Sequence, residues 1–293
     1  MRKSRRRTAS GLAALCAAAL MAGGGAAPAP AAPAERYVAL GDSYTSGPGI
    51  PRQVDAGCAR SDRNYPSLTA RELRVASFTD VSCGGATTAD MWRAQGGNPP
   101  QLTAVSRTTT LVTVQIGGND IGFGEIMATC GRLGATDPAG APCTAHWTAD
   151  GADVLADRIE AAAPLVEKVL DAVHQRSPRA RVYVLGYPPI LPETGPGCWP
   201  QVTTAAGDAP YLRATAKRLN AMLRQVAERS RARYVDTYTP AIGHDACRPP
   251  AERWMEPLVP ASPAAPYHPN AAGERAMADA LLERLAEPGR GRR

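Results

Sequence analysis

Short apolar runs alternate with longer stretches of helical periodicity along most of this chain. Strands and helices in alternation favour a parallel sheet with helices on both faces. The predicted strands are 37–40, 78–82, 111–116, 182–185 and 234–236, and the predicted helices are 65–74, 152–176, 211–229 and 271–286. The longest helix contains Pro164, which predicts a kink. No repeat or second domain is visible, so we expect one three-layer α/β/α domain with a central five-stranded parallel sheet.

The first 34 residues differ from the rest in composition and are typical of an export signal. Five basic residues precede an apolar stretch at 11–22, and Ala32-Pro33-Ala34 provides a small-residue cleavage site. The apolar stretch is much shorter than the ~20 residues that span a bilayer, so no stable membrane anchor is expected. We therefore predict a signal peptide at 1–34, a mature domain at 35–293 and a secreted protein.

The basic character of the full sequence comes mostly from this first segment. The chain has 33 basic and 27 acidic residues, for a formal net charge of +6. All five charges within 1–34 are positive, so the mature part keeps 28 basic and 27 acidic residues and a net charge of +1. A nearly balanced charge without a basic patch does not indicate a nucleic-acid partner.

Six of the seven cysteines lie in the mature part of the chain. An even number of cysteines in an exported protein favours disulfides over metal binding or catalysis. Six cysteines allow 15 pairings, and their spacing alone does not choose among these. A zinc site is not expected, because none of the four histidines lies at a Cys/His ligand spacing.

Four short motifs stand where a parallel sheet can bring them together, since α/β proteins place their chemistry at the carboxyl ends of strands. Three of them follow predicted strands and one precedes the last predicted helix. They are Gly41-Asp42-Ser43-Tyr44, Ser82-Cys83-Gly84-Gly85, Gly117-Gly118-Asn119-Asp120 and Tyr267-His268-Pro269-Asn270. Each motif alone is also ordinary turn or helix-capping composition. The ordered set is much more specific than any one member.

The order and context of these motifs resemble the SGNH (GDSL) hydrolase family, in particular its secreted actinobacterial lipase and esterase branch. The resemblance extends from Tyr37 to the last predicted helix. It implies a single hydrolase domain that cleaves carboxylic esters without a cofactor or a metal ion. It also implies three disulfides, namely Cys58–Cys83, Cys130–Cys143 and Cys198–Cys247.

This resemblance makes Ser43 the nucleophile and His268 the base that takes its proton and returns it to the departing alcohol. The oxyanion hole would consist of the backbone N–H groups of Ser43 and Gly85 and the side-chain amide of Asn119. Glycine suits such a position because a bare backbone can approach the substrate closely. The register between Gly84 and Gly85 stays open, since Gly84 takes the place of a serine that is usual in this branch. Gly85 is our choice.

One part that many relatives carry is missing, namely an aspartate three residues before the histidine. Ala265 occupies that position here. We therefore expect a Ser-His dyad in which a backbone carbonyl, that of Ala265 or of Pro266, fixes the tautomer of His268. Asp236, at the end of the last predicted strand, is the alternative acid, and Asp245 is a weaker one.

Three long loops rich in glycine and proline, 131–142, 186–210 and 239–266, hold or adjoin cysteines, so we expect them to be ordered walls around a pocket. Apolar side chains in or near these loops fit an acyl chain, but they fit small loop cores equally well. They are Met127, Ile190, Leu191, Trp199, Trp254, Leu258 and Val259. We expect a monomeric lipase or esterase that acts on lipid or other acyl esters. The alternatives are a polysaccharide acetyl-ester hydrolase and a non-catalytic extracellular binding protein on the same fold.

Overall fold

The computed structural model of the protein describes residues 35–287, and the predicted signal peptide at 1–34 lies outside them. Five parallel strands form the sheet in the order β4-β1-β5-β6-β7. Their bounds are β1 Arg36–Gly41, β4 Ser77–Asp80, β5 Leu111–Gln115, β6 Arg181–Leu185 and β7 Arg233–Val235. All five strands were predicted, with ends that differ by one or two residues.

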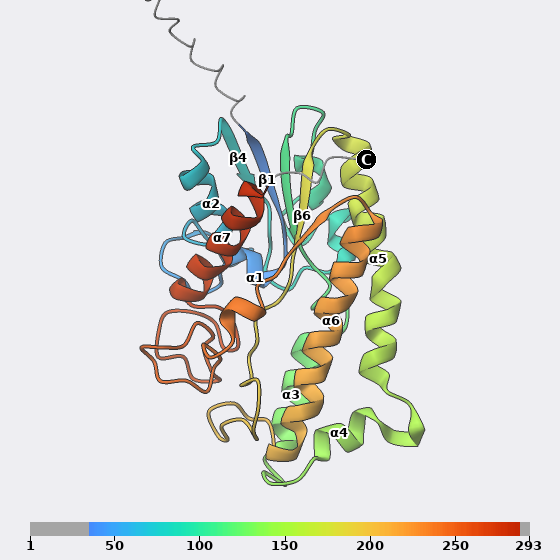
Figure 1. Ribbon diagram of the computed structural model, residues 1–293, viewed down its shortest axis with the longest axis vertical. Helices are drawn as coiled ribbons and strands as arrows, with labels where there is room; N and C mark the ends of the chain where they lie inside the picture. Colours follow the sequence, from blue (N-terminus) through green and yellow to red (C-terminus); the bar gives the residue numbers. More distant parts are fainter. Residues whose placement is uncertain (1–34, 288–293) are drawn as a thin grey trace, which may run out of the picture. The chain divides into compact units, whose positions relative to one another are not determined.

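Helices cover both faces of the sheet, which confirms the three-layer prediction (Figure 1). Helices α2 (Tyr65–Leu73) and α7 (Ala271–Ala286) pack on one face, and α5 (Val154–Arg176) and α6 (Ala209–Arg229) pack on the other. Helix α5 continues through Pro164 as one element. Within residues 35–287, no helix has the length and apolar character needed to cross a membrane.

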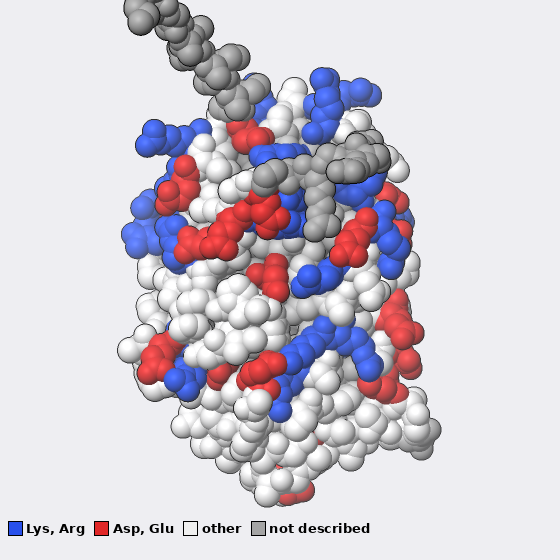
Figure 2. Space-filling view, viewed as in Figure 1, with Lys and Arg blue, Asp and Glu red and all other residues white. Residues whose placement is uncertain are grey.

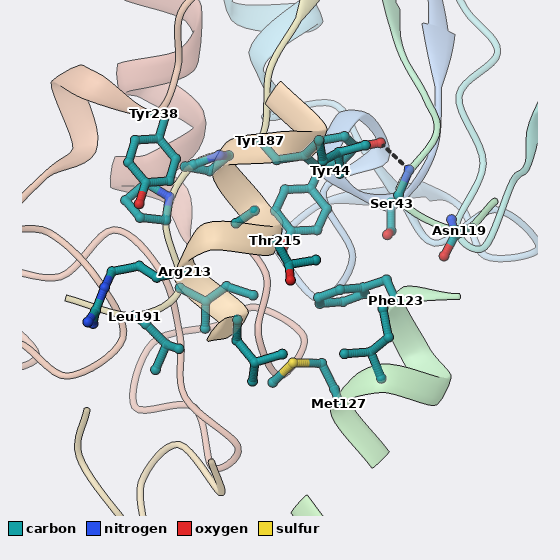
Figure 3. Close-up of a pocket in the computed structure, with 18 of the residues that line it drawn as sticks. Ser43, Tyr44, Asn119, Phe123, Met127, Tyr187, Leu191, Arg213, Thr215 and Tyr238 are labelled. Atoms are coloured by element: carbon teal, nitrogen blue, oxygen red, sulfur yellow. Dashed lines mark hydrogen bonds between the residues drawn. The ribbon is translucent and has the colours of Figure 1, made fainter. Parts of the chain in front are cut away.

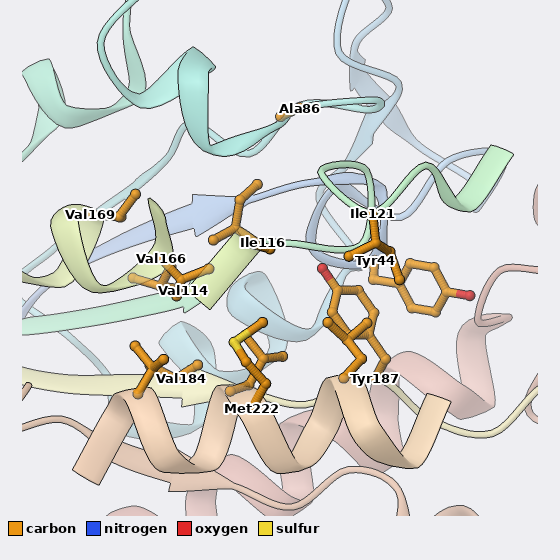
Figure 4. Packing of buried hydrophobic residues seen from close by; sticks show 14 of the residues in the cluster. Tyr44, Ala86, Val114, Ile116, Ile121, Val166, Val169, Val184, Tyr187 and Met222 are labelled. Atoms are coloured by element: carbon orange, nitrogen blue, oxygen red, sulfur yellow. The ribbon is translucent and has the colours of Figure 1, made fainter. Parts of the chain in front are cut away.

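The strands are apolar along their whole length because both faces of the sheet are covered. In β1, Tyr37 and Ala39 belong to the core beneath α2 and α7, whereas Val38 and Leu40 belong to the core beneath α5 and α6. Figure 4 shows this second core close to Tyr44 and Tyr187, where side chains of β5 and β6 meet those of the two helices. A strand buried on both faces reads as a continuous apolar run, which is why β1 is visible in the sequence.

Several elements that the sequence did not predict surround the carboxyl ends of the strands. They are α1 (Ser43–Ser46), α3 (Phe123–Gly134), α4 (Pro142–Trp147) and the hairpin of β2 (Gln53–Asp55) and β3 (Arg60–Ser61). The predicted loop at 131–142 is therefore wrong over part of its length, since the connection between α3 and α4 is only 135–141. Helix α3 contains three glycines, which lower helix propensity, and it is held by burial of its apolar side.

The three disulfides predicted from the family resemblance are present, namely Cys58–Cys83, Cys130–Cys143 and Cys198–Cys247. The first joins the turn between β2 and β3 to the segment that follows β4, and the second joins α3 to α4. The third joins the two longest loops, at a separation of 49 residues along the chain. The long loops are thus tied to one another and to helices, as expected for the walls of a pocket.

Candidate active site

Ser43 lies at the point where β1 ends and a single helical turn begins. The side chain of Asp42 caps this turn by accepting a hydrogen bond of 2.9 Å from the N–H of Tyr44. Gly41 is required here, because a Cβ at this position would lie 2.8 Å from the backbone oxygen of Gln115 and closer still to Thr45. The sharp change from strand to helix holds the Ser43 hydroxyl at the carboxyl edge of the sheet.

The imidazole of His268 contacts the Ser43 hydroxyl although the two residues are 225 positions apart. The distance between His268 Nε2 and Ser43 Oγ is 2.7 Å, and the distance between His268 Nδ1 and the carbonyl oxygen of Pro266 is 2.8 Å. A carbonyl oxygen only accepts, so Nδ1 carries the ring proton and Nε2 is free to accept from the serine. Partial burial lowers the pKa of His268, against the opposing effect of the Pro266 carbonyl, so the neutral form is favoured.

Of the two carbonyls proposed from the sequence, that of Pro266 faces the ring and that of Ala265 does not. The Ala265 oxygen instead accepts a hydrogen bond of 3.2 Å from the backbone N–H of His268. The intervening residue, Tyr267, has a φ of +62°, in the left-handed region that a tyrosine rarely adopts. This turn of the chain points the Pro266 carbonyl back toward the imidazole.

Neither alternative acid contacts His268. Asp236 caps the turn after β7, where its carboxylate accepts from the N–H groups of Tyr238 and Thr239 at 3.0 Å, and it lies 3.6 Å from Arg224. Asp245 is buried and accepts from the N–H of Cys247 at 3.0 Å. Both carboxylates are therefore explained by the loops that contain them.

The segment that carries His268 is held by a buried polar cluster centred on Glu256. The backbone N–H of Glu256 donates to the His268 carbonyl at 3.0 Å, and its own carbonyl accepts from the N–H of Tyr267 at 3.0 Å. Its side chain, fully buried, accepts from the amide of Asn270 at 2.8 Å and pairs with Arg253 at 3.2 Å. Burial opposes ionisation of Glu256, but hydrogen bonds from Asn270 and Ala261 outweigh it and hold its pKa below the ordinary value.

The three candidate oxyanion donors come from different segments. The amide of Asn119 donates one hydrogen bond of 2.8 Å to the carbonyl of Ala86 and has a second N–H left. Gly84 donates its N–H to the carbonyl of Cys58 at 2.9 Å, whereas the N–H groups of Gly85 and Ser43 donate to no other described residue. Gly85 has a φ of +76°, which suits glycine. Because its N–H is not engaged elsewhere, Gly85 is favoured over Gly84 as an oxyanion donor.

A second polar network that sequence reasoning missed joins the Ser43 turn to the Asn119 loop. The hydroxyl of Tyr187 donates to Asp42 at 2.6 Å and accepts from the N–H of Gly118 at 3.0 Å. Asn220 of α6 fixes Tyr187 in turn, by bonds of 2.8 and 2.9 Å to its backbone. Burial raises the pKa of Asp42 to about 7, although the bond from Tyr187 opposes this shift. The position of Tyr187 just beyond β6 was the signal available in the sequence.

An apolar pocket opens beside Ser43, with Asn119 at the same end and Arg213 and Tyr238 at the other end (Figure 3). Its volume is about 110 Å³. Met127, Ile190 and Leu191 line it, as the sequence predicted. Most of the remaining wall comes from apolar faces of α3 and α6 and from the segment after β6, including Phe123, Ile126, Pro188, Pro189, Leu212, Ala216 and Leu219.

The other four apolar residues predicted near the site do not line this pocket. Trp199 packs against Gly134 of α3, and Trp254 stacks on the ring of His244 at a centroid distance of 3.8 Å. Leu258 and Val259 are exposed to solvent, by 43% and 79%. Both tryptophans are partly buried and contact other parts of the loops and helices. In residues 35–287, no cluster of three or more His, Cys, Asp or Glu side chains is arranged to hold a metal ion.

Comparison with known proteins gives a consistent result. Residues 39–276 match the model of the GDSL-like lipase/acylhydrolase family. The chain is 45% identical over 269 residues to Lipase 2 of Streptomyces coelicolor, which covers 89% of each chain.

Two solved structures are also similar. Phospholipase A1 from Streptomyces albidoflavus is similar with a TM-score of 0.72 and 30% identity, over 85% of this chain and 99% of that one. The extracellular lipase of Streptomyces rimosus is similar with a TM-score of 0.67 and 29% identity, over the same shares. This chain therefore belongs to the GDSL-like lipase/acylhydrolase family and is a carboxylic ester hydrolase.

Proposed function

We propose that this protein is a secreted lipase that cleaves esters of medium and long acyl chains with a Ser43-His268 dyad. The observation that carries the proposal is the 2.7 Å contact between Ser43 Oγ and His268 Nε2 at one end of an apolar pocket. A nucleophile within reach of its base, and a base oriented by a third group, is the arrangement that acyl transfer requires.

In the acylation step, Ser43 Oγ attacks the ester carbonyl while its proton moves to His268 Nε2. The positive imidazolium is supported by the Pro266 carbonyl, which accepts from Nδ1–H. Collapse of the tetrahedral intermediate expels the alcohol, which takes the proton from Nε2, and leaves an acyl group on Ser43. A water molecule then attacks the acyl group on Ser43 while His268 takes its proton. Collapse of this second intermediate releases the fatty acid, and the proton on His268 returns to the serine.

The negative oxygen of each tetrahedral intermediate needs donors that are already in place. We assign this role to the backbone N–H groups of Ser43 and Gly85 and to the free amide N–H of Asn119. Support comes from the unengaged N–H groups and from the position of Asn119 on the pocket wall beside Ser43. The hydrogen bonds of Tyr187 to Asp42 and Gly118 fix the Ser43 turn and the Asn119 loop relative to each other. The donors therefore need no reorganisation during the reaction.

Pocket size and lining favour an acyl chain over an acetyl group. The volume of about 110 Å³ is several times the ~10–15 Å³ that one water molecule, similar in size to a methyl group, requires. The side chains of α3 and α6 along the pocket are mostly apolar, and burying CH₂ groups against them gains about 0.8 kcal/mol each. A chain of several carbons is thus stabilised more than acetate.

A series of 4-nitrophenyl esters from acetate to palmitate tests the proposal. We expect kcat/KM to rise from acetate to chains of about six to ten carbons, and reaction with a serine-directed phosphonate to disappear in Ser43→Ala. A sharp preference for acetate would instead support a polysaccharide acetyl-ester hydrolase. Absence of both turnover and labelling in the wild type would support a binding protein.

Export and a monomeric state belong to the same proposal. The composition of residues 1–34 and three disulfides suit an exported chain, and one similar structure is that of an extracellular lipase. Amino-terminal sequencing of protein from the culture medium is expected to begin at Glu35, and sedimentation is expected to give the mass of one chain. Retention of the intact amino terminus within cells would contradict export.

A further inference from the structure

Two uncharged stretches of loop lie beside the pocket and form one continuous surface. Residues 194–207 and 257–267 contain no charged side chain. The N–H of Leu258 donates to the carbonyl of Gln201 at 3.0 Å, and the hydroxyls of Thr203 and Tyr267 lie 3.0 Å apart. We call these two stretches together the loop surface. It adjoins the catalytic pair at His268.

The loop surface also adjoins the acyl pocket, because Thr204 lines that pocket and directly follows Thr203. The disulfide Cys198–Cys247 ties the first stretch to the loop that leads into the second. Apolar side chains on this surface would therefore be close to the point where a lipid leaves its aggregate and enters the site.

Exposed large apolar side chains are concentrated on the loop that leads to His268. Within residues 35–287 only six large hydrophobic side chains are exposed, and three of them, Ile242, Leu258 and Val259, belong to this loop. Val259 is the most exposed of the six, at 79%. Single exposed apolar residues need no explanation, but adjacent ones beside a ligand site indicate a contact surface.

Charge is sparse around this surface. Figure 2 shows charged side chains thinning out toward the lower end, where Figure 1 draws α3, α4 and the yellow loop that contains the first stretch. The charged residues that flank the two stretches in the sequence are engaged. Glu193 pairs with Lys217, and Glu256 pairs with Arg253. Asp208 accepts from the N–H groups of Cys143 and Thr144, and Arg213 donates to the carbonyls of Pro192 and Gly195. A surface without free cations has no means of attracting anionic headgroups, which clusters of Lys and Arg provide elsewhere.

We propose that the loop surface docks this enzyme on the uncharged surface of acylglycerol droplets, with Leu258 and Val259 inserted among the acyl chains. This inference rests on the proposed lipase function, and it adds that the substrate is taken from an aggregate. The pocket then receives an acyl chain at the interface without passage of the lipid through water. Insertion of two side chains gives weak and reversible attachment.

Binding is measured by flotation of the full chain with trioctanoin droplets, in a Ser43→Ala background so that the lipid is not consumed. We expect Val259→Glu to weaken droplet binding about tenfold and Leu258→Glu with Val259→Glu to weaken it further. The control is Leu165→Glu on α5, because Leu165 is exposed to 45%, close to the 43% of Leu258, and belongs neither to the pocket lining nor to the loop surface. Equal binding of the control and the double variant would overturn the proposal.

Activity with the native Ser43 separates this inference from the function on which it depends. We expect Val259→Glu and the double variant to hydrolyse soluble 4-nitrophenyl butyrate like the wild type and to lose about tenfold or more of their rate on droplets. Unchanged rates on both substrates would overturn docking and leave the lipase intact, whereas a wild type inactive on both would refute the lipase function.

Two further outcomes would also overturn the proposal. The first is stronger flotation with anionic phosphatidylglycerol vesicles, or with phosphatidylcholine vesicles, than with trioctanoin droplets. The second is a dimer in sedimentation that Val259→Glu disrupts, since the surface would then be covered by a second copy of the chain. Val259 is mostly exposed, so its substitution leaves the folded core in place.

Discussion

The two residues of the proposed dyad lie in regions of very different construction. Ser43 begins the helical turn α1, which is separated by one residue from β1, an inner strand of the sheet that is buried on both faces. His268 sits at the end of a long loop without a strand of the main sheet, held by the cluster around Glu256 and by a disulfide. The proposed nucleophile is thus positioned by secondary structure, and the proposed base is positioned by tertiary contacts.

Removing either end of the dyad is expected to have the largest effect. Ser43→Ala and His268→Ala should each lower kcat on a soluble ester by on the order of 10⁴- to 10⁶-fold, and the double variant should lose little more, because the two groups act as a unit. Single-turnover assays with protein of verified fold measure this. A His268→Ala variant that keeps a tenth of the activity would remove the base from the mechanism.

Asn119→Ala tests the proposed oxyanion donor that is contributed by a loop at the sheet edge. We expect kcat to fall about 100- to 1,000-fold with little change in KM, because the amide acts on charge that develops only in the transition state. The melting temperature should change little. A rise in KM at constant kcat would mean that Asn119 binds the ground state instead.

Glu256→Gln tests whether the position of His268, at the end of its long loop, depends on tertiary contacts. Breaking a buried ion pair while keeping the shape is expected to cost about 3 kcal/mol of stability, which thermal unfolding measures. We also expect kcat to fall about tenfold, because small displacements of a catalytic group are costly. Glu252→Gln, in an exposed pair with Arg248 in the same loop, is the control and should match the wild type.

The pH dependence of activity tests the environment of His268. Burial lowers its pKa, so the neutral base persists to lower pH than in an exposed histidine. The acid limb of kcat/KM for a neutral ester is therefore expected below pH ~6.5, the ordinary value for histidine. An apparent pKa of the acid limb above this value would indicate a carboxylate beside the His268 ring, as in a Ser-His-Asp triad.

Asp236→Asn is expected to have the smallest effect. The carboxylate of Asp236 caps a turn and does not contact His268, so kcat should stay within about threefold of the wild type, with a loss of about 1 kcal/mol in stability at most. A loss of several thousandfold with an intact fold would show that Asp236 is the missing acid and that the Pro266 carbonyl is not the orienting group.

Much of the fold was visible in the sequence because strands and helices are set by short-range patterns. The apolar runs located all five strands, and the helical periodicity located α2, α5, α6 and α7 to within a few residues. Helix α3 was missed because its glycines weaken the local signal, and only packing against neighbouring elements makes it helical. The family resemblance supplied the three disulfide pairs, which spacing alone could not.

By itself, the sequence determined the α/β layers, the strand ends that carry Ser43 and Asn119, and the identity of His268 as the candidate base. Only the tertiary structure decided that the Pro266 carbonyl faces the ring, which residues of α3 and α6 line the pocket, and that Glu256 holds the His268 segment. The reason is physical. Strand ends follow from local burial patterns, whereas contacts across some 200 residues depend on how every intervening loop packs. One unusual φ, at Tyr267, decides which carbonyl reaches the imidazole.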